Sequence, residues 1–374
     1  MTSFPVSATP QDAGIQRATT IELFFDLVLV FAATQLTSLI GHPHGPEDYL
    51  KAGLVFVSLL WIYDGFVWLT SNLEVQTRRE RWLMFVAMAG FFLMALGIPT
   101  IFGAGGLPYA LGLLLVTGIH TALFARATNS SAAAIWGVAP YNFGSALLIL
   151  AAAFAPLPWR WALWGAAVLL LIMVSLLRRE TQFSLSPRHF AERHGLLMIV
   201  ALGESIVALG LGARELPLNA ELLVYAALGL FVSVGLWWTY FDRDDQRAEY
   251  LLAAAPAEQR ARMALQGFGF GHFAMIFGII LIAAGLEVGI QHPTEHAEAA
   301  SAFNLAAGLS VYLLGDLYYR RVLDIGPGGV RLLAAGLALL TIPLGLFISA
   351  LAQVVAVLVV LAALWFVEGR SASD

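Results

Sequence analysis

Twelve apolar runs, each about as long as a membrane-crossing helix, limit most strongly what this chain can fold into. A helix needs about 20 mostly apolar residues to cross a bilayer. Only 12% of the 374 residues are charged, about half of the share in soluble domains. We therefore predict an all-α fold, a polytopic transmembrane helical bundle. The predicted spans are 20–40, 50–71, 82–102, 107–127, 135–156, 159–177, 195–213, 221–241, 267–287, 302–320, 331–349 and 351–368.

The placement of the basic residues tests this number of spans independently. Seventeen of the 20 Lys and Arg residues fall on one side of the predicted bundle, and Lys51, Arg160 and Arg214 fall on the other. Cytoplasmic loops are enriched in Lys and Arg, so both termini are predicted to be cytoplasmic, with tails at 1–19 and 369–374. The start of the chain lacks the basic region and apolar centre of a signal peptide, so we expect the first helix to remain as an anchor.

The two halves of the sequence resemble each other. Aligning Glu22 with Glu192 places Thr34 opposite Glu204, and WIYDGFVW at 61–68 resembles WWTYFD near the end of the eighth span. Six helices per half is an even number, so tandem halves would have the same orientation, as parallel repeats in some transporters do. We predict a first six-helix repeat at 20–177, a cytoplasmic linker at 178–194 and a second repeat at 195–368.

One longer loop, at 242–266, separates the eighth and ninth predicted spans. It is charged and rich in alanine, a composition that suits a short helix lying at the membrane surface. The last two spans are separated by few residues, so they could instead form one long bent segment.

Ionisable residues inside the predicted spans are the candidate functional residues. A charge at mid-bilayer costs roughly 2.5–3.5 kcal/mol on insertion scales, and the residues tolerated there usually face the bundle interior. The candidates for an ion or proton path are Asp26, Asp64, Glu204, His120, His272 and Asp316. A second group, expected as an interfacial polar cluster, holds Glu22, Glu192, Arg193, His194 and Asp242.

Depth along the helices separates one candidate from the others. Glu204 lies near the middle of its span, and it is the strongest functional candidate because a carboxylate there is costly to keep for packing alone. At about 1.5 Å per residue, the other path candidates lie roughly 6–11 Å inside the cytoplasmic boundary. We therefore predict one polar layer in the inner half of the membrane.

Structural roles remain an alternative for most of these residues. Caps or salt bridges at the membrane surface would account for Glu22, Glu192 and Asp242. Hydrogen bonds between helices would account for Asp26 and Asp64, and core packing for His120 and His272.

Glu22 and Asp26 raise a particular question because they share one helix face, four residues apart. Two carboxylates at this spacing repel each other. Arginines near the inner surface, a proton or a bound ion could neutralise them.

No pattern in the sequence predicts an enzyme. The chain has no cysteine, which excludes disulfides, thiolate metal sites and iron–sulfur clusters. We find no serine elbow and no HExxH motif. The glycines of GFGFG at 267–271 open a membrane span without a preceding strand, so they do not predict a phosphate loop. The single lysine, Lys51, lies at the edge of a span, which disfavours a buried Schiff base.

Two external loops carry paired histidines beside acids. They are GHPHGPED, with His42, His44, Glu47 and Asp48, and QHPTEHAE at 291–298. Such residues could hold a divalent metal weakly, but a solvated loop explains them better. We predict no catalytic residue, no cofactor and no resident metal.

Three segments carry a resemblance to a known family. TIELFFDLVLVFAATQL, ERHGLLMIVALGESIVALG and WWTYFD resemble hallmark segments of the bacterial low temperature requirement protein A (LtrA) family. The resemblance extends over roughly 17–368. It implies a polytopic bacterial inner-membrane protein that the family name links to growth in the cold, and it supplies no catalytic residues.

The first helix alone is also similar to the Arg-x-x-x-Phe-Ser-Asp helix of a potassium channel family built from six-helix repeats. The matching residues are Phe25, Asp26, Val28, Ala32 and Thr34. Phenylalanine stands where that family has serine, and Arg17 is displaced from the family's arginine position. A shared pore mechanism therefore does not follow from this likeness.

Two classes of function are compatible with these features. The first is transport of an ion, either a cation or a proton-coupled species, or of a small solute between two six-helix halves. The second is a non-transporting membrane protein that scaffolds a partner or senses bilayer state in cold stress. The expected partners are the lipid bilayer and a cation or proton, without nucleic acid, and a homodimer would suit a channel-like arrangement.

Overall fold

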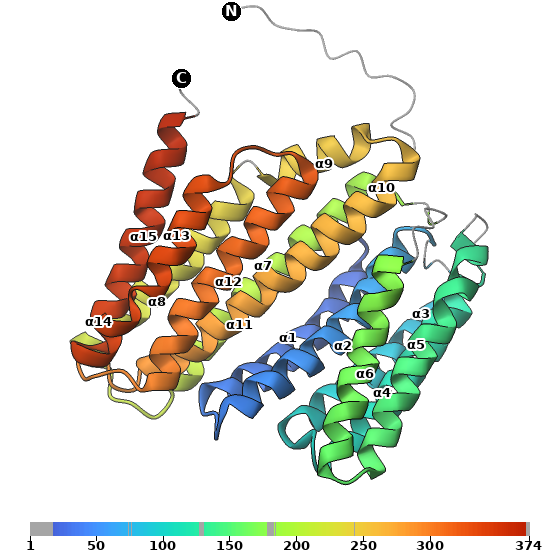
Figure 1. Cartoon of the computed structure of the whole chain (residues 1–374), viewed down its shortest axis with the longest axis horizontal. Coiled ribbons are helices and arrows are strands. Elements are labelled where there is room, and N and C mark those ends of the chain that lie inside the picture. The colour runs from blue at the N-terminus through green and yellow to red at the C-terminus, as the bar shows by residue number, and fades with distance from the viewer. Residues whose placement is uncertain are drawn as a thin grey trace, which may run out of the picture.

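The computed structural model describes residues 18–73, 75, 77–126, 131–177, 183, 185–242 and 244–371. These residues form helices and no strand. Within this part of the chain, twelve helices are long and apolar enough to cross a membrane, which confirms the predicted all-α fold and the number of spans. The helices run side by side in one tilted bundle, with α2–α6 on one flank and α8, α13 and α15 on the other (Figure 1).

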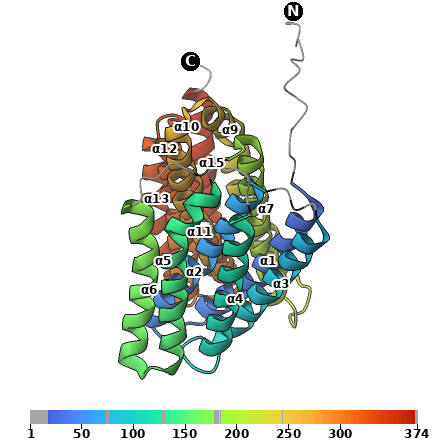
Figure 2. The ribbon, with the colours of Figure 1, turned by 90° about the vertical axis from the view of Figure 1, so that its right-hand side faces the viewer.

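The first half of the chain forms α1 (Thr20–Gly41), α2 (Pro46–Thr70), α3 (Arg78–Gly97), η2 (Ile98–Thr100), α4 (Gly106–Phe124), α5 (Ser131–Phe154) and α6 (Leu157–Leu177). The second half forms α7 (Pro187–Gly212), α8 (Ala220–Phe241), α9 (Asp244–Ala254), α10 (Ala257–Met263), η3 (Ala264–Gly271), α11 (His272–Gly289), α12 (Ala299–Leu323), α13 (Gly329–Leu339), α14 (Ile342–Phe347) and α15 (Ala350–Ser371). Helix α1 contacts both α7 and α11 and so joins the two halves. In the view turned by 90°, α4, α5 and α6 lie in front of the second half (Figure 2).

Several helices begin earlier than the hydropathy pattern predicts. Helix α7 begins at Pro187, inside the range predicted as a linker, and not at 195. The prediction began too late because the first turns of the helix carry charged residues, which lower the mean hydropathy of that segment. The ninth span likewise begins with α10 at Ala257 rather than at 267. It continues through η3, a π-helix that no sequence pattern indicated, into α11. The loop at 242–266 is helical as expected, in α9 and α10.

The last two predicted spans are separate in the structure. Helices α13 and α14 together make one span, and α15 makes the other. Helix α13 ends at Leu339, and the short α14 that follows has Pro343 in its first turn. Since proline lacks a backbone N–H and cannot continue a helix ladder from the preceding turn, this residue accounts for the break.

Glycines set two matching helix crossings, one in each half. A Cβ at Gly90 of α3 would lie 3.3 Å from the carbonyl oxygen of Gly112 in α4. A Cβ at Gly278 of α11 would lie 2.6 Å from the carbonyl oxygen of Gly308 in α12. Small residues let helix backbones approach closely in membranes. The matched crossings agree with the predicted tandem repeat, which remains a prediction.

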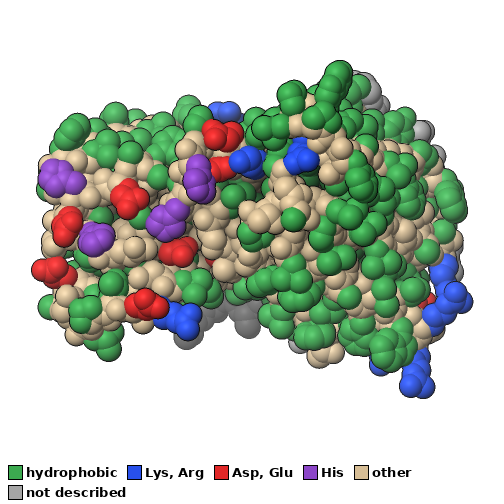
Figure 3. All heavy atoms as spheres, turned by 90° about the horizontal axis from the view of Figure 1, so that it is seen from below, with side chains coloured by type: hydrophobic (Ala, Val, Ile, Leu, Met, Phe, Trp, Pro, Cys, Tyr) green, Lys and Arg blue, Asp and Glu red, His purple; other side chains and the backbone are tan. Residues whose placement is uncertain are grey.

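The two ends of the bundle differ. Helices α9 and α10 lie at the end where α1 begins and α15 ends (Figure 1), and we call it the α9–α10 end. Seen from the opposite end, acidic and histidine side chains gather over the part of the molecule that carries α14 (Figure 3). The loop between α11 and α12, which lies at this opposite end, exposes His292, Glu295 and His296.

Candidate functional site

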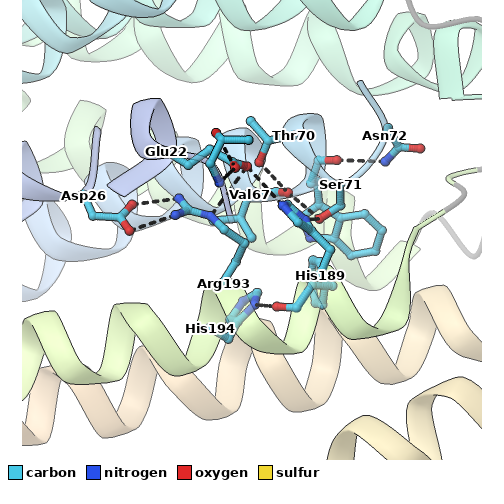
Figure 4. Close-up of polar contacts among 12 residues, drawn as sticks. Glu22, Asp26, Val67, Thr70, Ser71, Asn72, His189, Arg193 and His194 are labelled. Carbon is cyan, nitrogen blue, oxygen red and sulfur yellow. Dashed lines mark hydrogen bonds and ion pairs between the residues drawn. The ribbon is translucent and has the colours of Figure 1, made fainter. Parts of the chain in front are cut away.

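Arg193 of α7 is buried against the two carboxylates of α1 (Figure 4). Its Nη1 and Nη2 lie 2.8 and 2.7 Å from the two carboxylate oxygens of Asp26, and its Nε lies 3.9 Å from Glu22 Oε1. The hydroxyl of Tyr63, on α2, donates to Asp26 at 2.5 Å. An arginine from the seventh helix therefore neutralises the acidic pair of the first helix, one of the possibilities that the sequence left open.

Glu22 also caps its own helix and contacts a histidine. Its Oε2 accepts hydrogen bonds from the backbone N–H and the hydroxyl of Thr19, both at 2.7 Å. Its Oε1 lies 3.3 Å from Nε2 of His189, whose Nδ1 lies 3.1 Å from the hydroxyl of Ser71 (Figure 4). These contacts tie α1, α2 and the start of α7 together at the α9–α10 end.

Asp64 of α2 is paired with His194 of α7. Its Oδ1 lies 3.1 Å from His194 Nε2, and its Oδ2 accepts a hydrogen bond from the indole N–H of Trp68 at 3.2 Å. The other ring nitrogen of His194, Nδ1, lies 2.9 Å from the carbonyl oxygen of Phe190. Carbonyl and carboxylate oxygens only accept hydrogen bonds. Both contacts are hydrogen bonds only when a proton lies between each ring nitrogen and its oxygen partner. The pair then holds two protons, one more than a carboxylate beside a neutral imidazole.

An aromatic group lies behind this pair. The rings of His194 and His272 have centroids 5.0 Å apart, and Phe268 of the π-helix η3 stacks on His272 at 5.4 Å. Nε2 of His272 lies 2.8 Å from the hydroxyl of Tyr240 on α8, and Tyr240 stacks on Tyr319 of α12. Contacts between rings thus extend from His194, the partner of Asp64, across the second half of the bundle.

A second buried ion cluster surrounds Arg331 of α13. Its Nη1 donates to Asp316 of α12 and lies 3.2 Å from Asp244 of α9. Its Nε and Nη2 lie 2.9 and 3.1 Å from the carboxylate of Glu368 on α15. Arg320 adds a contact of 2.6 Å to Asp244. This cluster connects four helices at the α9–α10 end.

Glu204 is buried apart from both clusters. It is fully buried in α7. It lies further from the α9–α10 end than both clusters do, about three turns along α7 from Arg193. Its Oε2 accepts a hydrogen bond of 2.7 Å from the hydroxyl of Thr34 on α1. The sequence alignment of the two halves placed these two residues opposite each other, and in the structure they touch.

A cavity of about 440 Å³ lies between the two halves. Helices α2, α4, α5 and α6 form one side, and α10 with the π-helix η3 forms the other. Asp64 and His120 line it, together with Glu258 and Arg262 of α10. Glu204 is not among its lining residues. The volume lies in the range of small-molecule sites, which are about 300–1,000 Å³.

The structure brings some of the predicted residues together and separates others. It joins Glu22, Asp26 and Arg193 in one cluster, and it joins Asp64 and His194 beside His272. His120 lines the cavity and lies 3.0 Å from the carbonyl oxygen of Gly65. Asp316 belongs to the Arg331 cluster, Glu192 is half-buried, and Asp242 is exposed.

Several residues of these clusters were not among the candidates of the sequence. They are Tyr63, His189, Asp244, Arg331 and Glu368. Arg331 and His189 lie in the first turns of α13 and α7. In a hydropathy pattern, charges at such positions look like parts of loops. Their burial depends on partners from other helices, which local hydropathy does not report.

The external histidine loops have other partners. His44 Nδ1 lies 3.3 Å from Asp48, whose other oxygen lies 2.5 Å from Lys51. His292 lies 3.8 Å from Glu295. In the part of the chain that the structure describes, no group of three or more His, Asp or Glu side chains has an arrangement that could hold a metal ion.

Comparison with known proteins places the whole bundle in one family. Residues 17–366 match the model of the bacterial low temperature requirement A protein (LtrA) family. An uncharacterized protein of Rhizobium meliloti (strain 1021) is 26% identical over 318 residues, which cover 80% of this chain and 76% of that protein. No solved structure matches the chain. Since the family model covers nearly the whole chain and twelve apolar helices lie within it, this integral membrane protein belongs to the LtrA family.

Proposed function

We propose that this protein transports an ion or a small solute across the bacterial inner membrane, and that the cavity between its halves is the binding site. One observation carries the proposal: the buried carboxylate of Asp64, paired with His194, lines that cavity. An ionisable residue inside a membrane span marks a substrate, ion or proton path in many membrane proteins. A site between tandem halves also suits the parallel repeats of transporters.

The α9–α10 end is proposed to face the cytoplasm. Seventeen of the 20 basic residues belong to this end in the predicted topology, and loops rich in Lys and Arg stay on the cytoplasmic side. The acidic and histidine-rich loops at the opposite end would then face outward. In this orientation the cavity and both ion clusters lie in the inner half of the membrane.

The candidate residues are proposed to have different roles, depending on whether they line the cavity. Asp64 and His120 would contact the solute, since both line the cavity. Asp26 and Arg193 would hold α1 against α7, since their two-point ion pair is buried away from it. Glu204 would lie further along a path toward the outer side.

A non-transporting scaffold remains a second candidate because of one observation. Both oxygens of Asp26 are engaged by Arg193, and Arg331 engages Asp244, Asp316 and Glu368. Buried charges paired in this way can serve packing and helix register alone. In that case the ion clusters would stabilise the bundle, and the cavity would carry no flux.

Flux into proteoliposomes separates the two candidates. Purified protein would be reconstituted and tested with protons, K⁺, Na⁺ and small organic ions and neutral solutes. We expect solute flux in the wild type that falls at least tenfold in Asp64→Asn and also in Glu204→Gln. Glu295→Gln, a change in an exposed carboxylate of the outer loop, serves as the control. Wild-type flux equal to that of empty vesicles for every solute would refute transport.

A further inference from the structure

We propose that the cavity binds a small organic ammonium ion in exchange for the proton held between Asp64 and His194. This inference rests on the proposed function and names the substrate class of the same site. It depends on three features of the structure: the arrangement of the acid–imidazole pair, the lining of the cavity, and the balance of charge around both.

The pair is placed so that only its acid can meet a solute. Asp64 lines the cavity, whereas His194 is 1% exposed and is not among the lining residues. The imidazole contacts Oδ1 of Asp64 and, on its far side, the carbonyl oxygen of Phe190. A cation entering the cavity would therefore compete with the imidazolium proton for one carboxylate.

The rest of the lining suits an organic cation. The aromatic residues Trp61, Trp68, Phe124 and Phe183 line the cavity. The indole N–H of Trp61 donates to Asn142, and that of Trp68 donates to Asp64. A solute can therefore interact with these two side chains only through their ring surfaces. Aromatic rings attract ammonium groups, more strongly when these are desolvated.

His120 does not oppose a cation in the cavity. Its Nε2 lies 3.0 Å from the carbonyl oxygen of Gly65, which accepts, so this nitrogen carries the proton. Nδ1 is then an acceptor, and it is buried without a protein partner. In this state the imidazole is neutral, so His120 adds no positive charge to the cavity wall that would repel an ammonium ion.

Charge balance explains why the exchange is one for one. The cavity wall adds one acid and one base of α10, Glu258 and Arg262. Behind the pair, Arg193 faces Asp26 and Glu22, His189 faces Glu22, and the ring of His272 faces His194. Replacing one positive charge by another leaves the net charge of this low-dielectric site unchanged, and an uncompensated buried charge would be costly.

The proposed step conserves atoms and charge. The ammonium ion enters from water and its N–H groups donate to the carboxylate of Asp64. The Nε2 proton of His194 leaves to water, and the imidazole keeps the Nδ1 proton that donates to Phe190. No covalent bond to the solute is formed or broken, and one proton is released for each amine bound.

Calorimetry on the purified full-length protein in detergent tests this exchange. The probes are phenethylammonium and its neutral analogue 2-phenylethanol, titrated in two buffers of different ionisation enthalpy so that proton release is measured directly. We expect the ammonium ion to bind at least tenfold more tightly than the alcohol, with release of about one proton per amine, as linkage requires. Equal binding of the two probes, no binding at millimolar concentration, or binding without proton release would overturn the proposal.

Two variants and one flux assay sharpen the result. Asp64→Asn should lose the preference for the ammonium ion. His194→Gln, whose amide can still donate to Asp64, should bind the amine without releasing a proton, and a symmetrical size-exclusion peak shows that each variant is folded. Amine binding with proton release but without amine flux in proteoliposomes would reject transport and keep the site. Flux of another solute without amine binding would reject only the inferred substrate class.

Discussion

The guanidinium of Arg193 holds both carboxylate oxygens of Asp26, at 2.7 and 2.8 Å, although the two residues are 167 positions apart in the chain. This two-point contact is buried and joins the first helix of one half to the first helix of the other. Removing one partner of a buried ion pair leaves an uncompensated charge and costs about 3–5 kcal/mol. The stability of the join between the halves should therefore depend on this pair.

Arg193→Ala is expected to lower the thermal stability of the detergent-solubilised protein strongly, because Asp26 would be buried without its cation. Arg188→Ala is the matched control, since Arg188 is half exposed and lies 3.9 Å from Glu249, and exposed pairs are worth about 0–1 kcal/mol. Melting curves followed by tryptophan fluorescence measure both. Equal melting temperatures for the two variants would contradict a stabilising role for the Asp26 pair.

Arg331→Ala should destabilise the second half because it leaves the carboxylates of Asp244, Asp316 and Glu368 without this shared partner. Adding Asp316→Asn to Arg331→Ala should recover part of the loss, since one buried negative charge is then removed. A double-mutant cycle on melting temperature measures the coupling. Additive effects of the two changes would show that Arg331 and Asp316 do not stabilise each other.

Thr34→Val should lower stability by about 1–3 kcal/mol, the cost of leaving a buried acceptor without its donor, because its hydroxyl donates to the fully buried Glu204 at 2.7 Å. Thr294→Val is the control, since its hydroxyl donates to Glu221 at an exposed site. Urea or thermal unfolding in detergent compares the two variants. An effect of Thr294→Val as large as that of Thr34→Val would argue against the internal bond.

Gly278→Ala should destabilise the crossing of α11 and α12, because the added Cβ would meet backbone atoms of Gly308 and Tyr312 at 2.6 Å. Overpacking of this kind typically costs about 1–3 kcal/mol. At Gly210 nothing lies within 4 Å of the added Cβ, so Gly210→Ala should leave the melting temperature unchanged. A neutral effect at Gly278 would mean that the two helices separate easily.

Single cysteines can be used to test the proposed orientation, because the natural chain has none. Gln246 of α9 and His292 of the α11–α12 loop are exposed at opposite ends of the bundle. A membrane-impermeant maleimide added to intact spheroplasts should label His292→Cys and should label Gln246→Cys only after the membrane is opened. The reverse pattern would place the termini outside the cytoplasm.

The twelve apolar helices were predictable from the sequence because membrane insertion depends on length and composition within one segment. The burial of Asp26, Asp64, Glu204, His272 and Asp316 was also predictable, since a charge inside a span is disfavoured in lipid. The helix starts at Pro187 and Ala257 were not. Charged first turns resemble loops in a hydropathy window, which cannot show that Arg193 of α7 is neutralised by the carboxylates of α1.

The partners of these residues were decided by the tertiary structure alone. The helices must be rotated and packed against distant parts of the chain before Arg193 meets Asp26, Arg331 meets its acids, or Asp64 lines the cavity. No local pattern contains that information, because a charged group is neutralised by whatever lies within a few ångströms in space and not by its neighbours in sequence. The sequence therefore determined that acids would be sheltered inside a membrane bundle, and packing determined which of them are paired with a base and which one lines the cavity.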